Sequence, residues 1–220
     1  MAASGLPAID LLVLTHDHYD HLDYTTIKAL APRVRRFCTA LGVGAHLERW
    51  GIPAEKITEF DWWETQPVAE ATTLTAVPAR HFSGRSLQRG KTLWTAFVLK
   101  LHGYSLFLGG DSGYDDQFKK IGDQYGPFDL AILECGQYGR DWPNIHMFPE
   151  ETAQAAQDLR AATLLPVHWG KFVLANHPWN EPIERLVKRA TEQQLPLATP
   201  RIGEPVRLGA TYPQTVWWRL

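Results

Sequence analysis

The sequence is poor in cysteine, has no excess of either charge and contains no long apolar run. Its 220 residues include only two cysteines, Cys38 and Cys135. The pair lacks the CxxC spacing of a zinc or redox motif, so we expect both to be small core residues. A cysteine-based metal or redox site is therefore not among the predicted functions.

The positive and negative charges nearly balance. Lysine and arginine together number 22, aspartate and glutamate 24, and the formal net charge is −2 at pH 7. A nucleic-acid surface needs a basic stripe that neutralises phosphates. Since no block of lysine and arginine occurs, we expect no nucleic-acid partner.

Targeting and membrane signals are also missing from the sequence. No window reaches the roughly 18 consecutive apolar residues of a membrane span. Residues 1–7 carry no positive charge and no long apolar stretch, unlike a secretory signal. We therefore predict a soluble, cytoplasmic chain without a membrane span.

What the sequence does contain is typical of a compact enzyme. Hydrophobic residues make up 45% of the chain and nine are tryptophan, which suits one domain over residues 1–220. The periodicity predicts an α/β fold. The predicted elements are strand 10–15, helix 23–31, strand 35–39, helix 43–50, a β-rich middle over 56–109, helix 114–124, strand 128–135, a helix from Pro149, strand 163–167, helix 182–194 and a short C-terminal strand pair.

The most informative motif follows the first predicted strand. His16, His18, Asp20 and His21 place three imidazoles and a carboxylate within six residues. In extended chain, positions two apart point the same way, so His16 and His18 can bind one metal ion. Asp20 and His21 come just before the predicted helix, which Asp23 can cap, and can serve a second ion.

Three further residues with an imidazole or carboxylate side chain each follow a predicted strand. His81 comes after residues 72–78, Asp111 after 105–110 and His168 after 163–167. The longest irregular segments are 80–92, 136–148 and 169–181, and all three adjoin such residues. Long loops in a compact domain are commonly functional, so we expect these three to form the substrate-binding rim.

The His-x-His-x-Asp-His motif resembles the signature of the metallo-β-lactamase superfamily, whose later ligands arrive in the order His, Asp, His. The resemblance implies an αββα sandwich and a dinuclear centre. It assigns His16, His18 and His81 to the first ion and Asp20, His21 and His168 to the second, with Asp111 bridging. Two Zn²⁺ ions fit this nitrogen and oxygen set best, and manganese or iron can occupy it.

Further motifs resemble one branch, the bacterial relatives of N-acylphosphatidylethanolamine phospholipase D and the ascorbate-6-phosphate lactonase-like hydrolases. That branch has additional strands before its first metal motif, whereas the first predicted strand here begins at Asp10. We therefore expect a sandwich that lacks part of its N-terminal sheet. The motifs that carry the likeness begin at Thr15, Phe60, Pro78, Gly109, His146 and Pro166.

The resemblance implies hydrolysis by a metal-bridging hydroxide, on a phosphodiester or phospholipid-like substrate. Asp20 would orient the nucleophile, and His146 would face the substrate phosphate and donate a hydrogen bond or proton. Arg80 and His177 are further candidate substrate contacts, with Arg85 and Arg89 as neighbours of Arg80.

Two alternatives stay open at this point. The first is a lactone or sugar-phosphate hydrolase, which would use the same ligands with different rim loops. The second is a non-catalytic, metal-stabilised subunit or fragment, because an incomplete sheet leaves an unpaired edge. The expected partners are accordingly a small-molecule or lipid-like anionic substrate and, in the second alternative, another copy of the chain that covers this sheet.

Overall fold

A computed structural model describes residues 5–85, 88–172 and 174–219. The chain divides into two compact units, which are taken separately below. The first comprises residues 1–78 and 82–97, and the second comprises residues 79–81 and 98–220.

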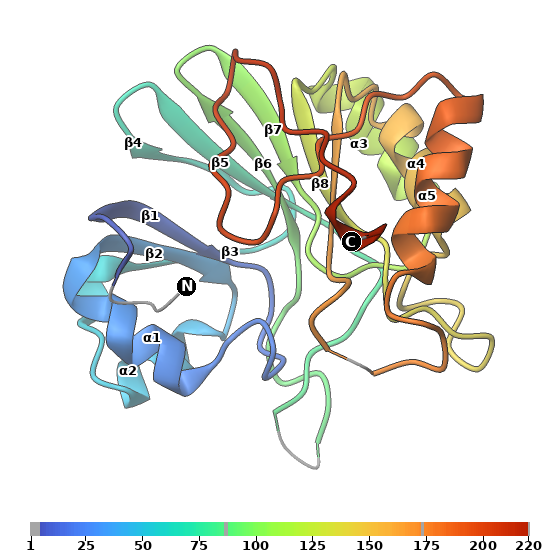
Figure 1. The fold of residues 1–220 in the computed structure, drawn as a ribbon. Helices are drawn as coiled ribbons and strands as arrows, with labels where there is room; N and C mark the ends of the chain where they lie inside the picture. Colours follow the sequence, from blue (N-terminus) through green and yellow to red (C-terminus); the bar gives the residue numbers. More distant parts are fainter. Residues whose placement is uncertain (1–4, 86–87, 173, 220) are drawn as a thin grey trace. The chain divides into compact units, whose positions relative to one another are not determined.

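The first unit is an α/β layer followed by a β-hairpin. Strands β1, β2 and β3 form a parallel sheet in that order, and β4 pairs with β5 in antiparallel fashion. Helices α1 and α2 lie on one face of the parallel sheet (Figure 1). The elements are β1 (Ile9–Leu14), α1 (Tyr24–Leu30), η2 (Ala31–Arg33), β2 (Val34–Ala40), α2 (Gly44–Arg49), η3 (Ala54–Lys56), β3 (Ile57–Phe60), β4 (Thr65–Ala69) and β5 (Thr72–Val77).

The core of this unit fills the space between the sheet and its helices. Leu22, Phe37 and Leu47 are fully buried there, among a cluster that also includes Val34 and Val43. Asp23 caps α1 as predicted, because its Oδ2 accepts a hydrogen bond of 2.7 Å from the Thr26 amide. Strand β1 ends at Leu14, and the motif that begins at His16 follows two residues later.

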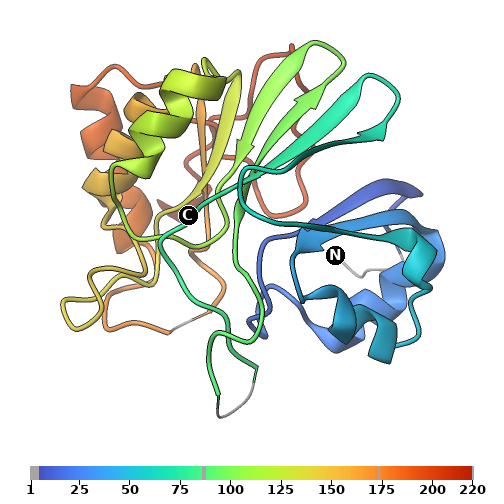
Figure 2. The same ribbon diagram turned by 180° about the vertical axis from the view of Figure 1, so that it is seen from behind.

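The second unit is built on three parallel strands and three helices. Strand β6 carries the chain into it, and β8 lies between β7 and β9. Helices α3, α4 and α5 lie side by side, with α4 in the middle (Figure 2). The elements are β6 (Ala96–Leu101), β7 (Tyr104–Leu108), α3 (Gln117–Tyr125), β8 (Leu130–Glu134), α4 (Pro149–Asp158), β9 (Leu164–Val167), α5 (Glu181–Glu192) and η4 (Trp217–Arg219).

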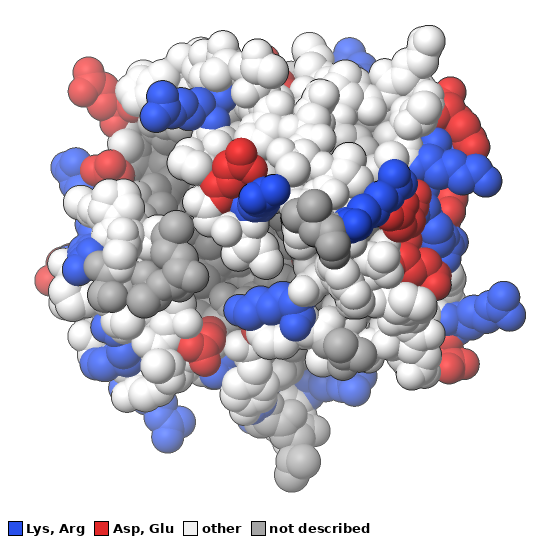
Figure 3. Space-filling view, in the orientation of Figure 1, with Lys and Arg blue, Asp and Glu red and all other residues white. Residues whose placement is uncertain are grey.

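Aromatic packing and charge pairs hold these helices. Phe107 of β7 meets Phe118 of α3 and Phe128 with ring centroids 6.2 and 5.6 Å apart. Arg185 of α5 makes two hydrogen bonds to the Glu150 carboxylate of α4, at 3.0 and 2.6 Å. On the face drawn in Figure 3, described Lys and Arg side chains lie interspersed with Asp and Glu.

The prediction of a C-terminal strand pair is wrong. Within residues 195–219 no strand forms; Leu197 makes an isolated bridge to Leu164, and η4 follows. The segment is instead anchored by tryptophan. Trp217 stacks on Trp169 with centroids 4.9 Å apart, and the Trp218 indole donates to the Glu184 carboxylate at 2.9 Å. Side-chain packing here replaces the backbone ladder that the apolar pattern suggested.

Candidate metal centre

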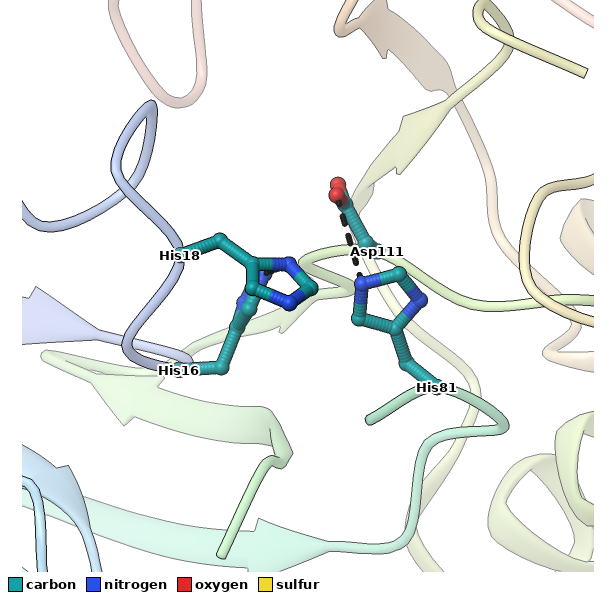
Figure 4. A group of neighbouring side chains, drawn as sticks. All are labelled: His16, His18, His81 and Asp111. Carbon is teal, nitrogen blue, oxygen red and sulfur yellow. Dashed lines mark hydrogen bonds and ion pairs between the residues drawn. The ribbon is translucent and has the colours of Figure 1, made fainter. Parts of the chain in front are cut away.

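The first group of candidate ligands lies on the loop that follows β1. His16 is 1% exposed, and its Nε2 lies 3.0 Å from Nδ1 of His18. Figure 4 shows both imidazoles leaving this loop toward one another. His21 brings its ring centroid to 4.2 Å from that of His16, and its Nε2 lies 3.6 Å from Oδ2 of Asp20. The structure therefore gathers all four residues of the motif.

A tight turn produces this convergence. The amides of His21 and Leu22 both donate to the carbonyl oxygen of His18, at 3.1 and 2.8 Å. The turn brings His21 back beside His16, while α1 begins at Tyr24. A strand end followed by a short turn into a helix is enough to build this group, which explains why its members are close in sequence.

Asp17 and Arg85 stabilise the loop that carries His16, His18 and His21. Asp17 is 2% exposed, and its Oδ1 accepts a hydrogen bond of 2.7 Å from the Gly84 amide. The Arg85 guanidinium donates to the carbonyl oxygen of Asp17 at 2.9 Å and lies 4.2 Å from the centroid of the Tyr19 ring. The guanidinium of Arg85 is thus engaged by the ligand loop itself.

His46 lies on the other side of Asp17. Its Nε2 is 3.7 Å from Oδ2 of Asp17. Burial lowers the pKa of His46, and the Asp17 carboxylate only partly offsets this effect. A neutral imidazole is therefore favoured beside Asp17.

The second group consists of the candidate ligands His81, Asp111 and His168 together with His146, and its members come from four separate segments of the second unit. Asp111 is 4% exposed, and its Oδ2 lies 3.8 Å from Nε2 of His81 and 3.5 Å from Nε2 of His168. Figure 4 marks the contact between His81 and Asp111. His146 stands between the two histidines, with ring centroids 5.3 Å from His81 and 5.4 Å from His168. One ligand atom from each of Asp111, His146 and His168 falls within 4.8 Å of the others.

Close backbone approach brings these segments together. A Cβ added to Gly113 would lie 2.2 Å from the carbonyl oxygen of Asn144, and one added to Gly136 would lie 2.3 Å from that of His168. Real Cβ atoms do not come this close, so only glycine lets the segments of Asp111 and His146, and the ends of β8 and β9, meet in this way. The His81 ring is held by its Nδ1, which lies 3.0 Å from the carbonyl oxygen of Ile145.

Sequence reasoning missed Glu134, the last residue of β8. It is fully buried, and its Oε1 accepts a hydrogen bond of 2.8 Å from the Met147 amide and lies 3.3 Å from Nδ1 of His146. Burial raises the pKa of this carboxyl group well above its usual range, and the Asp111 carboxylate adds to the effect. The available signal was a single acidic residue in the otherwise apolar strand Leu130–Glu134.

The predicted substrate contacts fall in different places. His146 lies beside Asp111 and His168, as described above. The Arg80 guanidinium donates to the Tyr114 carbonyl oxygen at 3.0 Å. His177 accepts from the Gln137 amide at 3.2 Å and stacks on Tyr138 with centroids 4.4 Å apart. It lines a cavity of about 400 Å³ together with Tyr138, Trp142, Phe148 and Arg185.

The chemistry of both groups fits a metal centre. Each presents imidazole nitrogens and a carboxylate that face one another at strand ends, and this donor set suits zinc, manganese or iron. Among the described residues, no helix combines the length and apolar character needed to cross a membrane.

Comparison with known proteins agrees with this chemistry. The family model described as "Beta-lactamase superfamily domain" matches residues 2–169. An uncharacterized protein of Mycobacterium tuberculosis is 46% identical over 99% of this chain and 59% of its own length, so the chain spans about three fifths of that relative. A "UPF0173 metal-dependent hydrolase" of Methanoregula boonei is 31% identical over 80% of this chain and 75% of its own length.

Two other likenesses concern a lipid hydrolase and a solved structure. The mitochondrial N-acyl-phosphatidylethanolamine-hydrolyzing phospholipase D of Saccharomyces cerevisiae is 36% identical over 82% of this chain and 40% of its own length. The crystal structure of isothiocyanate hydrolase from Delia radicum gut bacteria superposes with a TM-score of 0.75 at 18% identity, covering 96% of this chain and 81% of the other. The predicted α/β, metallo-β-lactamase-like fold is thereby confirmed, and the chain belongs to the metallo-β-lactamase superfamily.

Proposed function

We propose that this chain is a dinuclear metal-dependent hydrolase of phosphodiester or phospholipid-like substrates. The observation that carries the proposal is the position of Asp111, whose Oδ2 faces the imidazoles of both His81 and His168. A carboxylate between two imidazoles at strand ends is the arrangement expected of a metal-bridging ligand.

The ligand assignment follows the order of ligands in the superfamily. His16, His18 and His81 would bind one ion, Asp20, His21 and His168 the other, and Asp111 both. Zinc is the proposed metal, because imidazole and carboxylate ligands suit it well. When bound, two such ions lower the pKa of a water molecule and neutralise charge on the attacked group.

Residues of the chain itself supply the remaining chemistry. Asp20 would accept a hydrogen bond from the attacking water and orient it. His146 would donate a hydrogen bond or a proton to the oxygen on which negative charge develops. The support for His146 in this role is its place beside Asp111 and His168 in the second unit.

The proposed substrate class rests on the family branch. The yeast relative, named for hydrolysis of N-acyl-phosphatidylethanolamine, matches 82% of this chain. Since the chain covers 40% of that protein, its activity and substrate carry over only as a proposal. An anionic, phosphate-bearing substrate also suits a metal centre that neutralises non-bridging oxygens.

The test combines metal analysis with two assays. Metal content per chain is measured by elemental analysis, and hydrolysis of bis-(p-nitrophenyl) phosphate and of a chromogenic thiolactone is followed in parallel. The wild type is compared with the double variant His16→Ala, Asp111→Ala. The matched control is His102→Asn, Asp123→Ala, which changes one exposed histidine and one exposed aspartate outside the candidate ligands.

We expect close to two zinc ions per chain, and phosphodiester turnover that the first double variant loses and the control keeps. Faster turnover of the thiolactone would favour the lactonase alternative. Two ions with no turnover of either substrate would favour the non-catalytic subunit. A chain that takes up no metal would overturn the proposed site.

A further inference from the structure

A cavity of about 400 Å³ lies within the second unit. One part of its wall follows β8 and includes Tyr138, Trp142 and Phe148, and the other part precedes and begins α5 and includes His177 and Arg185. Ligand cavities in proteins have volumes of about 300–1,000 Å³ and combine apolar walls with a few polar groups. The size and the aromatic lining of this cavity therefore suit a small molecule.

The polar atoms of two of these rings are already used inside the protein. The Tyr138 hydroxyl donates to Oε1 of Glu181 at 2.6 Å. Nε1 of Trp142 donates to the carbonyl oxygen of Gln137 at 2.8 Å. Since the hydroxyl and the indole N–H are both engaged, these two residues offer a ligand mainly their ring carbons.

The His177 ring is engaged in the same way. Its Nε2 accepts from the Gln137 amide at 3.2 Å, and its Nδ1 lies 3.0 Å from the carbonyl oxygen of Pro178. The Gln137 side chain also donates to the Phe172 carbonyl oxygen and accepts from the Leu174 amide, both at 2.9 Å. Gln137 therefore holds the two parts of the wall together, and the predicted substrate contact His177 can offer its ring surface but not its nitrogens.

The charges that line the cavity balance one another. Nε and Nη2 of Arg185 donate to the Glu150 carboxylate at 3.0 and 2.6 Å, and Nη1 donates to Oε1 of Glu181 at 3.3 Å. The other two charged lining residues, Arg140 and Asp141, are exposed and opposite in sign. The wall as a whole therefore favours neither an anion nor a cation.

These contacts decide which kind of ligand the cavity favours. A charged group loses its hydration on entry, and polar groups that are already bound to one another give little in return. An uncharged ring loses little hydration and gains stacked or edge-on contacts with the rings of the wall. Since an apolar cavity of about 150 Å³ holds benzene, a cavity of about 400 Å³ accommodates more than a single ring.

We infer that this cavity binds an uncharged aromatic group. The cavity and the group around Asp111 share a segment, because the lining residue Phe148 lies two residues after His146. An aromatic substituent of a phosphodiester is therefore the part of the substrate assigned to the cavity. That assignment rests on the proposed function, whereas the binding of the aromatic group does not.

The first test measures binding without catalysis. The purified protein, with its metal content recorded, is titrated by calorimetry with three probes that share one ring system: naphthylmethanol, which is uncharged, naphthylmethylammonium and naphthalenesulfonate. We expect naphthylmethanol to bind at least about tenfold more tightly than either ion. If naphthylmethanol fails to bind, or if either ion binds this cavity more tightly, the inference is wrong.

The second test locates the binding in the cavity. Trp142→Ala removes the indole, whereas Trp142→Phe keeps a ring and deletes the N–H group. Trp63→Ala, at an exposed tryptophan of the first unit, is the matched control. Tm is measured for each variant, and Phe148→Leu, which deletes a ring but keeps apolar bulk, replaces Trp142→Ala if that variant does not fold.

We expect Trp142→Ala to weaken the binding of naphthylmethanol about tenfold, because the contacts with one aromatic wall are lost. Trp142→Phe and Trp63→Ala should both bind nearly as tightly as the wild type. Equal affinities in Trp142→Ala and the wild type would show that the probe binds elsewhere, which would overturn the inference.

Turnover separates this inference from the proposed function. With bis-(p-nitrophenyl) phosphate, Trp142→Ala should raise KM about tenfold and leave kcat nearly unchanged, as expected when an interaction is lost equally from the ground state and the transition state. If naphthylmethanol binds as expected and nothing is hydrolysed, the cavity is a binding site and the proposed function fails. If the diester is hydrolysed and naphthylmethanol does not bind, the proposed function stands and the inference about the cavity fails.

Discussion

The two groups of candidate ligands are built in opposite ways. In the first unit, His16, His18, Asp20 and His21 come from one turn after β1, and local hydrogen bonds to the His18 carbonyl bring them together. In the second unit, His81, Asp111, His146 and His168 come from four segments, which the pairing of β7, β8 and β9 and the close backbone contacts at Gly113 and Gly136 bring together. The first group depends on a loop, and the second depends on the whole unit.

Because of this difference, the two groups should be disrupted by different kinds of substitution. The first is supported by two side chains: the Asp17 carboxylate accepts from the Gly84 amide, and the Arg85 guanidinium donates to the carbonyl oxygen of Asp17. The second is supported by backbone contacts at Gly113 and Gly136 that no larger residue would allow. Changes to side chains should therefore loosen the first group, whereas changes to backbone packing should disrupt the second.

The largest effect is expected from Asp111→Ala. This variant removes the carboxylate that faces both His81 and His168, and a metal-bridging ligand stabilises transition-state charge by several kcal/mol, equivalent to ~10³-fold or more in kcat/KM. Elemental analysis should show metal loss together with the loss of phosphodiester turnover. Asp123→Ala, at an exposed site on α3, is the control and should retain both. If Asp111→Ala kept full metal content and activity, Asp111 would not be a metal ligand, and the ligand assignment in the second unit would be wrong.

Gly113→Ala tests the dependence of the second group on backbone contact. The new Cβ would meet three backbone atoms of Asn144 at 3.0 Å or less, so the segment that bears His146 must shift. Overpacking of this kind costs about 3 kcal/mol, with Tm lower by roughly 2–4 °C for each kcal/mol, as calorimetry would show. Gly5→Ala, which has open space around it, should leave Tm unchanged. An unchanged Tm in Gly113→Ala would mean that the close contact is not required.

Asp17→Ala tests the support of the first group. The Gly84 amide loses its acceptor, and a donor left unsatisfied near the interior costs about 1–3 kcal/mol. We expect a smaller fall in the free energy of unfolding than for Gly113→Ala, measured by urea denaturation. Amide exchange at Gly84 should also become faster. Asp61→Ala, an exposed aspartate on the same unit, is the control; equal effects from the two variants would contradict a specific role for Asp17.

The smallest effect is expected at the N-terminal end of α5, outside both groups, where Glu181 contacts Tyr138 of the segment that follows β8. The Tyr138 hydroxyl donates to Glu181 at 2.6 Å, and this hydrogen bond, with help from Arg185, lowers the pKa of Glu181. A carboxyl group with a lowered pKa contributes stability above its unfolded pKa of about 4.3, and this contribution is lost as the pH falls through the folded pKa.

Glu181→Gln should therefore be less stable than the wild type at pH 7, by about 1 kcal/mol or less, and equal to it at acid pH. The midpoints of urea denaturation are measured for both proteins at a series of acid pH values. The two midpoints should become equal below the ordinary pKa range of carboxyl groups. Glu55→Gln, an exposed glutamate of the first unit, is the comparison. A Glu181→Gln offset that persists at acid pH would show that the effect is steric and not one of charge.

The same contrast explains how much of the fold and of the candidate site could be predicted from the sequence. His16 to His21 form a contiguous pattern, and strand and helix signals on either side fix its geometry, so the motif could be interpreted residue by residue. Asp111 and His168 could be found as polar residues at strand ends. The contact of Glu134 with His146 could not be predicted, because the two residues are twelve positions apart in the sequence and only the fold brings them near. The C-terminal segment was misjudged for a related reason, since tryptophan packing in the second unit holds it without a ladder.

The tryptophan stack at the end of the chain offers a way to watch the second group without any substrate. Trp169 follows the candidate ligand His168 directly, and Trp217 lies on it with an interplanar angle of 19°. Two indoles held this closely couple their intense electronic transitions and contribute a pair of bands to the far-ultraviolet circular dichroism. That signal would show in solution whether Trp169, next to His168, is stacked on Trp217. It could be followed as metal is added.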